Sequence, residues 1–257
     1  MTFRLMAVGD VVGKPGLDFL AARLKKIREE KNIDFVVVNG ENANMIGITP
    51  SQADEIFESG ADAITLGNHT WIRWELKPYL DKEQRILRPA NFAPQCPGSG
   101  YRVFNTDAGK LLLINLMGKF TLDANTDNPF VIVDSILSEN EIRMVFVDFH
   151  AEATSEKLAM GYHLDGRVSA VWGTHTHVQT SDIRVLQHGT AYITDIGMTG
   201  AENGVLGVKK EQSIGKFFGD PPQRFNPADG SAKLEGAIFD INPETGACLN
   251  AEAIRVM

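Results

Sequence analysis

Short runs of Val, Ile and Leu alternate with stretches of helical spacing over the first two thirds of the chain, and this alternation limits the fold more than any other feature. It favours an α/β architecture in which helices layer against mostly parallel strands. The expected strands are residues 3–9, 34–39, 62–66, 110–116, 143–149 and 168–172.

Helices are expected in the intervening segments. Residues 16–31 carry apolar side chains at helical spacing on one face, with Lys and Arg on the others. Thr49 and Pro50 form an N-cap followed by Pro at the first helical position, and Gly60 stands where a C-cap glycine is expected. Further helix patterns cover residues 74–82, 129–138, 153–160 and 209–218.

The last forty or so residues predict a different kind of structure. A loop rich in Pro and Gly over residues 220–230 precedes two extended segments joined by a turn at 242–246, which together predict a closing antiparallel hairpin. The chain shows no internal repeat and no linker composition. Residues 1–257 are therefore expected to form a single domain.

Charge and cysteine content narrow the class of protein. The formal net charge of −8 argues against broad attraction to nucleic acid or an anionic membrane, because such binding needs clustered Lys and Arg. Cys96 and Cys248 are far apart and lack metal-site spacing, so neither a disulfide framework nor a structural zinc site is expected. No membrane-span or signal-peptide pattern is present, and the expected location is the cytoplasm.

Five of the apolar runs pass directly into residues that can bind a metal or move a proton: LMAVGD, VVVNGEN, AITLGNH, VFVDFH and SAVWGTHTH. Ligands of open α/β sheets bind beyond the carboxyl ends of the strands, so these side chains are expected to meet in one place. The residues concerned are Asp10, Glu41, Asn42, Asn68, His69, His150, His175 and His177.

Histidine usage supports a site at these strand ends. Four of the six histidines follow the apolar runs, and only His163 and His188 lie elsewhere. A single histidine at a strand end is more often a structural residue than a ligand, but five coincident strand ends favour the functional interpretation. Gly67 is expected to permit a turn. His175 and His177, two residues apart in extended backbone, are expected to project to the same side.

The donor set predicts the kind of metal. Imidazole, carboxylate and amide groups without thiolate suit divalent manganese, iron or zinc better than an all-oxygen magnesium or calcium site. Seven candidate ligands exceed the needs of one ion, so two ions are expected, and a carboxylate such as Glu41 can bridge them. Two divalent ions with Asp10 and Glu41 leave a net charge of about +2, which attracts phosphate to an acidic protein. His69, if it is not itself a ligand, is placed to hydrogen-bond or protonate a leaving oxygen.

Five motifs carry a resemblance to a known family over the whole chain: GDVVGKPG, NGENAN, GNHTW, DFHAEATSEK and DGRVSAVWGTHTHVQTSD. With them the chain resembles the YmdB-like branch of the calcineurin-like metallophosphoesterases, a group of bacterial phosphodiesterases. The resemblance implies an α/β fold that forms a four-layer α/β/β/α sandwich, with two facing mixed sheets flanked by helices and a dinuclear metal site. Iron and manganese are the first expectation for the metals, with zinc and magnesium as alternatives.

The resemblance also implies roles for individual residues. Where the wider superfamily opens with Asp-x-His, this chain has Asp10-Val11-Val12, and Asn42 is expected to replace the missing histidine. His69 is expected to be the general acid. The implied ligands are Asp10, Glu41, Asn42 and His177 for one metal, and Glu41, Asn68, His150 and His175 for the other.

The function predicted on these grounds is a metal-dependent phosphodiesterase that uses a two-metal-activated hydroxide. Its expected substrates are small phosphodiesters, namely 3',5'- or 2',3'-cyclic nucleotides and generic aryl diesters. Two alternatives stay open: a regulatory nucleotide- or partner-binding protein with little turnover, and a phosphomonoesterase. A homo-oligomer is compatible with the sequence, which leaves the natural substrate and any protein or RNA partner open.

Three further segments have weaker functional interpretations. Lys14 and the following Pro-Gly pair lie near a predicted phosphate site, but they are also ordinary residues for a helix entrance. The glycine-rich stretch 197–207 is a candidate for the pocket mouth, although it lacks the pattern of a phosphate-binding loop. His163 is expected either to alter the rim of the pocket or simply to pack.

Overall fold

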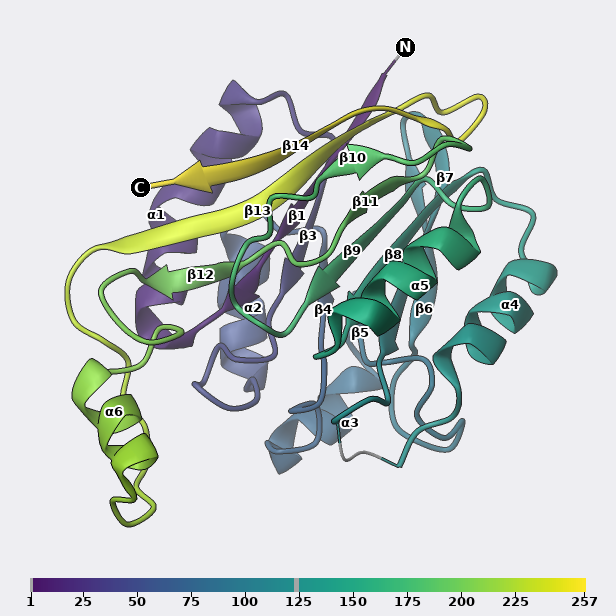
Figure 1. The fold of residues 1–257 in the computed structure, drawn as a ribbon. Helices are drawn as coiled ribbons and strands as arrows, with labels where there is room; N and C mark the ends of the chain where they lie inside the picture. Colours follow the sequence, from purple (N-terminus) through teal and green to yellow (C-terminus); the bar gives the residue numbers. More distant parts are fainter. Residues whose placement is uncertain (1, 123–124) are drawn as a thin grey trace.

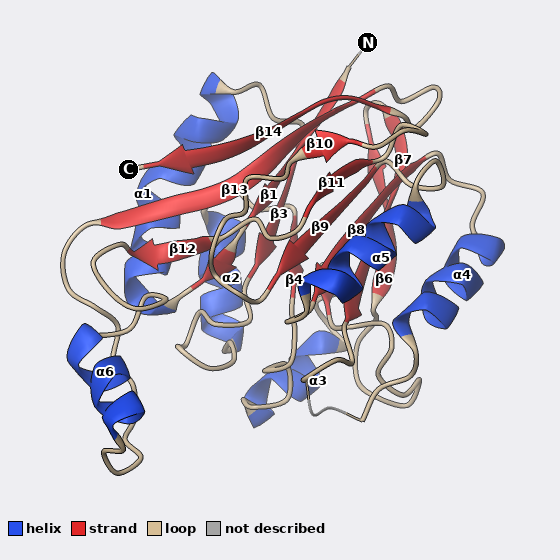
Figure 2. Cartoon of the chain, viewed as in Figure 1, coloured by secondary structure: helices blue, strands red, loops and turns tan. Residues whose placement is uncertain are grey.

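Two β-sheets lie face to face in the computed structural model of the chain, which describes residues 2–122 and 125–257 (Figure 1). Helices lie on the outer side of the sheets, so that strands occupy the interior and helices the exterior (Figure 2). The expected four-layer α/β/β/α sandwich of two mixed sheets is confirmed.

The larger sheet has the strand order β2-β12-β13-β1-β3-β4-β5, with β14 paired to β13. β1, β3, β4 and β5 run parallel, whereas β13 is antiparallel to its neighbours β1, β12 and β14. Its strands are β1 (Phe3–Val8), β2 (Asp10–Val11), β3 (Phe35–Asn39), β4 (Ala63–Thr65), β5 (Ile86–Leu87), β12 (Met198–Ala201), β13 (Ala232–Ile241) and β14 (Cys248–Val256).

The smaller sheet has the order β10-β11-β9-β8-β7-β6. β7, β8, β9 and β11 are parallel, and the two edge strands β6 and β10 are antiparallel to their neighbours. Its strands are β6 (Tyr101–Thr106), β7 (Gly109–Met117), β8 (Met144–His150), β9 (Ala170–Thr174), β10 (Arg184–Val185) and β11 (Ala191–Ile193).

The helices agree with the sequence patterns within a few residues, apart from one that is divided. The expected helix over 74–82 is a 3₁₀ turn, η1 (Trp74–Leu76), followed by the short α3 (Lys77–Leu80). Thr49 caps the second helix as expected, in a capping box with Gln52. The helix that Thr49 caps is α2 (Pro50–Glu58). The other helices are α1 (Gly13–Glu30), α4 (Pro129–Glu139), α5 (Thr154–Leu164) and α6 (Lys210–Phe218).

Alternation of side chains along the strands divides the apolar residues into three cores. In β1, Leu5 packs between the two sheets, whereas Met6 packs toward α1 and α2. A third core joins the smaller sheet to α4 and α5. Between the sheets, Trp172 of β9 stacks on Phe239 of β13 with ring centroids 5.7 Å apart. The sheets are thus fixed against each other by buried aromatic contact.

Several short or edge strands were not expected from the sequence. β6 is an edge strand whose side chains are mostly half-buried, so it lacks a strong apolar pattern. β2, β5, β10, β11 and β12 are too short to show a period. The expected C-terminal hairpin is confirmed, because β13 and β14 pair in antiparallel register around the turn at 242–246. Both cysteines are free, as expected.

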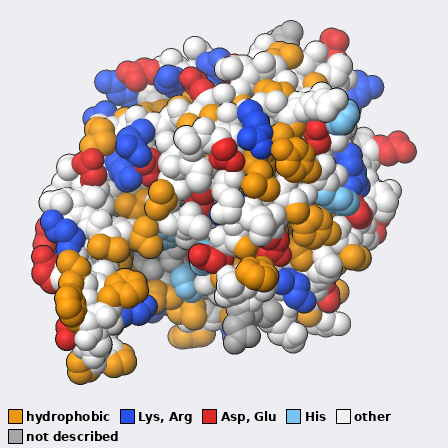
Figure 3. All heavy atoms as spheres, in the orientation of Figure 1, with side chains coloured by type: hydrophobic (Ala, Val, Ile, Leu, Met, Phe, Trp, Pro, Cys, Tyr) orange, Lys and Arg blue, Asp and Glu red, His pale blue; other side chains and the backbone are white. Residues whose placement is uncertain are grey.

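The surface of α6 carries exposed aromatic side chains. This helix projects from the body of the molecule, and apolar side chains gather over it (Figures 1 and 3). Phe217 and Phe218 are 87% and 86% exposed. Among the described residues, no helix combines the length and the apolar character needed to cross a membrane.

The contact between the sheets gives a stability prediction. Phe239→Ala removes a fully buried ring and is expected to lower the free energy of unfolding by about 3 to 5 kcal/mol. Phe218→Ala, which removes an exposed ring, is expected to change it by less than about 0.5 kcal/mol. Urea denaturation of both variants measures the difference. Equal losses in the two variants would contradict this packing.

Candidate metal centre

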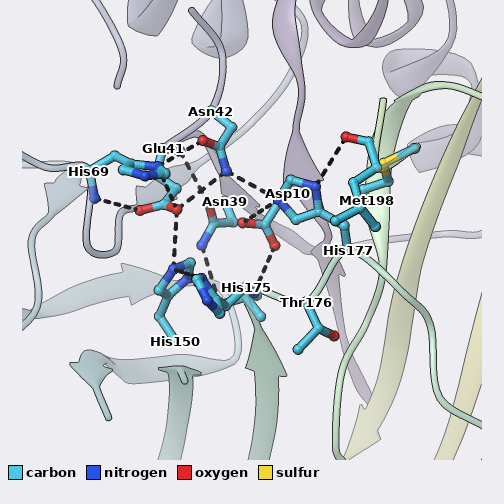
Figure 4. Close-up of polar contacts among 12 residues, drawn as sticks. Asp10, Asn39, Glu41, Asn42, His69, His150, His175, Thr176, His177 and Met198 are labelled. Atoms are coloured by element: carbon cyan, nitrogen blue, oxygen red, sulfur yellow. Dashed lines mark hydrogen bonds and ion pairs between the residues drawn. The ribbon is translucent and has the colours of Figure 1, made fainter. Parts of the chain in front are cut away.

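The eight residues expected at the strand ends lie together, and they come from both sheets. Asp10 follows β1, Glu41 and Asn42 follow β3, and Asn68 and His69 follow β4, all in the larger sheet. The smaller sheet contributes the end of β8 and the loop after β9, with His150, His175 and His177. Figure 4 shows seven of these side chains pointing toward one another across the junction of the two sheets, namely Asp10, Glu41, Asn42, His69, His150, His175 and His177.

One group of donors surrounds the Nε2 atom of His150. This atom lies 3.1 Å from Glu41 Oε1, 2.9 Å from Asn68 Oδ1 and 3.1 Å from His175 Nδ1. The donor atoms of Glu41, His150 and His175 all lie within 4.8 Å of one another. Both Glu41 and His150 are buried. Four donors therefore converge within the range that a single cation can reach.

A second group lies beside it, around His177. The Nε2 atom of His177 lies 3.7 Å from Asp10 Oδ1 and 3.2 Å from Asn42 Nδ2. Asn42 Nδ2 is in turn 3.3 Å from Glu41 Oε1, so Glu41 is adjacent to both groups. The two groups have the same membership as the two ligand sets implied by the sequence motifs.

The amide of Asn42 has an orientation that matters for its expected role. Its Oδ1 atom faces His69 Nδ1 at 2.9 Å, and its Nδ2 atom faces Glu41 and His177. An amide binds a cation through oxygen, so ligation by Asn42 requires the amide to turn and exchange these two atoms. The position of Asn42 fits a ligand, whereas the orientation drawn in Figure 4 fits a hydrogen-bond partner of His69.

His69 lies at the open side of the cluster. Its side chain is 29% exposed, and its backbone N–H donates to Glu41 Oε2 at 3.1 Å. Nδ1 contacts Asn42 Oδ1, while Nε2 has no hydrogen-bond partner among the described residues. Nε2 is therefore the ring nitrogen left available to a bound molecule.

The expectation of extended backbone at His175 and His177 is wrong. β9 ends at Thr174, and the two histidines have left-handed φ angles of 102° and 62°. Such angles cost energy in residues with a Cβ atom and need support from their surroundings. The carboxylate of Asp10 accepts the N–H of His175, and the carboxylate of Asp195 accepts both the N–H and the hydroxyl of Thr176.

The expected turn begins at Gly67, whose carbonyl accepts the N–H of Thr70 at 3.3 Å, but close packing is what requires glycine there. A Cβ atom at this position would lie 2.3 Å from the His150 ring and 2.4 Å from Glu41 Oε2. No side chain fits at such distances, so the strand end must be glycine for the ligands to approach the backbone. The requirement is close approach and not a left-handed φ angle.

The charges of the cluster favour a cation at its centre. Burial opposes a charge on His150, but Glu41 and Asp10 nearby raise the pKa of His150 to about 9. Burial and the charge of His150 lower the pKa of His175 to about 3. Burial would raise the pKa of Glu41, yet the charge of His150 holds it well below its usual range. A proton on His150 thus occupies the place between donors where a metal would lie.

Two buried carboxylates test whether the site fits metal ions. Asp10 and Glu41 are contacted by imidazoles, amides and backbone N–H groups. Asp10 Oδ1 is buried without a hydrogen-bond partner. A buried, unpaired carboxylate oxygen is costly unless a positive charge lies beside it. The imidazole, carboxylate and amide donors fit a pair of borderline divalent cations.

Several further residues around the site were not singled out from the sequence. Asp148 precedes His150 by two residues on β8, and Asp195 pairs with the buried Lys157 at 2.7 Å. Glu152 contacts His175 Nε2 at 3.0 Å. The detectable signal for Asp148 was a charged residue inside an apolar run, two positions from a candidate ligand and hence on the same strand face. Asp195 and Glu152 had no such pattern.

The three segments with weaker functional interpretations in the sequence have mostly structural roles. Lys14 is exposed and pairs with Asp18 one helical turn away. His163 lies on α5, where it pairs with Asp134 and packs against Phe130 of α4, so it packs and does not shape the pocket. The stretch 197–207 does border the site, because the carbonyl of Leu206 lies 3.4 Å from His177 Nδ1.

The family model described as "YmdB-like protein" matches residues 6–254. The chain belongs to the YmdB-like family. This YmdB-like chain is 44% identical over 256 residues to a Bacillus subtilis protein named 2',3'-cyclic-nucleotide 2'-phosphodiesterase, covering 98% of this chain and 97% of that protein. The resemblance drawn from the motifs is confirmed.

Two solved structures share the fold of this YmdB-like chain. A hypothetical protein from Thermus thermophilus has a TM-score of 0.92 and 36% identity, covering 99% of both chains. A structure described as a novel phosphatase from Mycoplasma pneumoniae has a TM-score of 0.94 and 33% identity, covering 100% of this chain and 94% of that one. The chain is an enzyme of the metallophosphoesterase class, as predicted.

The close approach at Gly67 gives a prediction about metal content. Gly67→Ala is expected to push His150 and Glu41 apart, and purified protein is expected to lose most of its bound metal in elemental analysis. The matched control is Gly161→Ala on α5, whose Cβ atom would meet the Tyr192 ring at 2.4 Å, far from the ligands in the fold. The control is expected to lose stability and keep its metal. Full metal content in folded Gly67→Ala protein would refute the assignment.

Proposed function

We propose that residues 1–257 form a single metallophosphoesterase domain that hydrolyses 2',3'-cyclic nucleotides with two divalent metal ions. The observation that carries this proposal is the convergence of the strand ends of both sheets on one buried group of donors. Because each sheet supplies part of the group, neither sheet alone would form the site. Iron and manganese are the metals we propose first, from the donor set.

The proposed ligands are assigned by proximity and donor type. Glu41 lies between the two groups of donors and is the residue placed to serve both ions. When bound, a pair of divalent ions lowers the pKa of water and neutralises the charge that develops on phosphoryl oxygens. One ion would be held by Asp10, Glu41, Asn42 and His177, and the other by Glu41, Asn68, His150 and His175.

His69 is the proposed general acid. Its Nδ1 atom is held by Asn42, which orients the ring and leaves the exposed Nε2 atom to carry a proton toward substrate. Glu41 Oε1 lies 3.3 Å from the same Nδ1 atom, so the held nitrogen also faces a carboxylate. Proton transfer to the leaving oxygen is the step that the free nitrogen can assist.

The substrate class follows from the Bacillus subtilis relative and from the chemistry of the site. That relative is named for 2',3'-cyclic nucleotides and for cleavage at the 2' position. For this chain, we infer that water adds to phosphorus and the bond to O2' breaks, which gives a 3'-monophosphate. 3',5'-Cyclic nucleotides and aryl diesters are further candidates.

The direct test compares substrates and variants on metal-loaded protein. Wild-type protein is expected to convert 2',3'-cyclic AMP to 3'-AMP, and chromatography of the reaction mixture measures the product. His175→Ala is expected to lose bound metal and to lower turnover at least about 100-fold, because it removes a proposed ligand. The control His163→Ala lies outside the cluster and is expected to keep both. Turnover by metal-free wild-type protein would contradict the proposal.

A phosphomonoesterase is the second candidate, since the relative from Mycoplasma pneumoniae is described as a phosphatase. Turnover of p-nitrophenyl phosphate and bis-p-nitrophenyl phosphate by one preparation separates the two activities. A higher rate with the monoester would favour the second candidate. Binding of cyclic nucleotide without turnover would instead favour a regulatory protein.

Removal of the proposed acid gives a separate prediction. His69→Ala is expected to keep its metal and to slow hydrolysis of 2',3'-cyclic AMP by about 10²- to 10⁴-fold, which is the usual contribution of a general acid. Hydrolysis of an aryl diester is expected to fall much less, because an aryl oxide leaves without protonation. Steady-state rates with both substrates provide the comparison. Equal losses with the two leaving groups would exclude His69 as the acid.

A further inference from the structure

The side of His150 that faces away from the donor group makes a contact that the proposed function does not use. Its Nδ1 atom lies 2.9 Å from the hydroxyl oxygen of Thr174, and both residues are fully buried. They are directly opposite each other, because β8 and β9 are parallel neighbours and His150 pairs with Thr174 in register. The hydroxyl group of Thr174 therefore orients the imidazole ring through Nδ1, the ring nitrogen that faces away from the donor group.

The hydroxyl of Thr174 has three polar neighbours. Its oxygen is 2.8 Å from Asp148 Oδ1, 3.4 Å from Asn39 Nδ2 and 2.9 Å from His150 Nδ1. The amide of Asn39 is itself oriented, because its Oδ1 atom accepts the backbone N–H of Glu41 at 3.2 Å. Its Nδ2 atom is thus the end that faces Thr174, and it can only donate.

The number of hydrogen atoms determines the direction of each bond. A hydroxyl group has one hydrogen to donate and two lone pairs to accept with. An Asp148 carboxylate can only accept, so the hydroxyl hydrogen of Thr174 points to Asp148. Both lone pairs are then left for Asn39 and His150. Thr174 can satisfy its buried neighbours only if Nδ1 of His150 carries a hydrogen and donates it.

We propose that Asp148, acting through the hydroxyl of Thr174, is a positioning residue that holds His150 as the tautomer protonated on Nδ1, with Nε2 free for a cation. This inference rests on the proposed role of His150 as a metal ligand. Histidine ligands commonly donate their second ring nitrogen to an oxygen that fixes the tautomer, and here a buried hydroxyl takes that place.

A second hydroxyl provides the matched control. Thr65 of β4 donates to the other oxygen of Asp148, Oδ2, at 2.5 Å and is as buried as Thr174. Each threonine satisfies one carboxylate oxygen, but only Thr174 also contacts His150. Thr65→Val and Thr174→Val are isosteric changes that each leave one buried oxygen of Asp148 without its hydroxyl. A merely structural role of the carboxylate would make the two variants alike.

The test measures binding of Mn²⁺ alone to metal-free protein by calorimetry. Thr174→Val is expected to weaken binding by about 10- to 100-fold, the usual effect of losing such a partner of a ligand. Thr174→Ser, which keeps the hydroxyl, and Thr65→Val are expected to stay within about 3-fold of wild type. Equal weakening in both valine variants, or unchanged binding in Thr174→Val, would overturn the inference.

A nuclear magnetic resonance measurement tests the tautomer directly and does not depend on any valine variant folding. The sample is wild-type protein with nitrogen-15-labelled histidine and bound Zn²⁺. The His150 signal is assigned by its loss in the variant His150→Gln. This signal is expected to show a protonated Nδ1 atom. An unprotonated Nδ1 overturns the inference. If wild-type protein binds neither Mn²⁺ nor Zn²⁺, the proposed function fails, whereas unchanged binding in Thr174→Val removes only the role of Thr174.

Discussion

Two carboxylates buried in one cluster, Asp10 and Glu41, are the constraint on which the rest of the site depends. Burying charged groups away from water is costly unless opposite charge lies beside them. Their contacts here are imidazoles, amides and backbone N–H groups, and one oxygen of Asp10 has no hydrogen-bond partner. A protein that retains this arrangement gains stability from a cation, which links metal binding to the stability of the fold.

The fold provides the place for these charges because parallel strands end at a common edge. β1, β3 and β4 of one sheet and β8 and β9 of the other all end at the junction, while aromatic and aliphatic contacts between the sheets keep the two halves of the site in register. The local backbone is less regular than the strands. Left-handed φ angles at His175 and His177 persist because hydrogen bonds from His175 to Asp10 and from Thr176 to Asp195 hold this segment.

An acidic protein that acts on phosphate needs positive charge confined to its site. With a net charge of −8, the protein would depend on cations held by the proposed ligands to attract phosphate. Family membership and the close relatives agree with a metallophosphoesterase. Asp148 and Thr174 are fully buried behind the ligands, and in the proposed arrangement they determine which ring nitrogen of His150 is available to a cation.

The sequence by itself determined the α/β class, most of the helices and the longer strands, and the residues at five strand ends, because strand periodicity and the direction of parallel strands are local properties. The motifs also indicated the family. Tertiary structure decided what depends on neighbours distant in the chain. It showed that close approach of His150 and Glu41 makes glycine necessary at position 67, beyond the turn that begins there. It also gave His175 and His177 left-handed rather than extended backbone, and it packed His163 against Phe130. Asp195 and Glu152 joined the site only through contacts between elements, and such contacts leave no periodic pattern in a sequence.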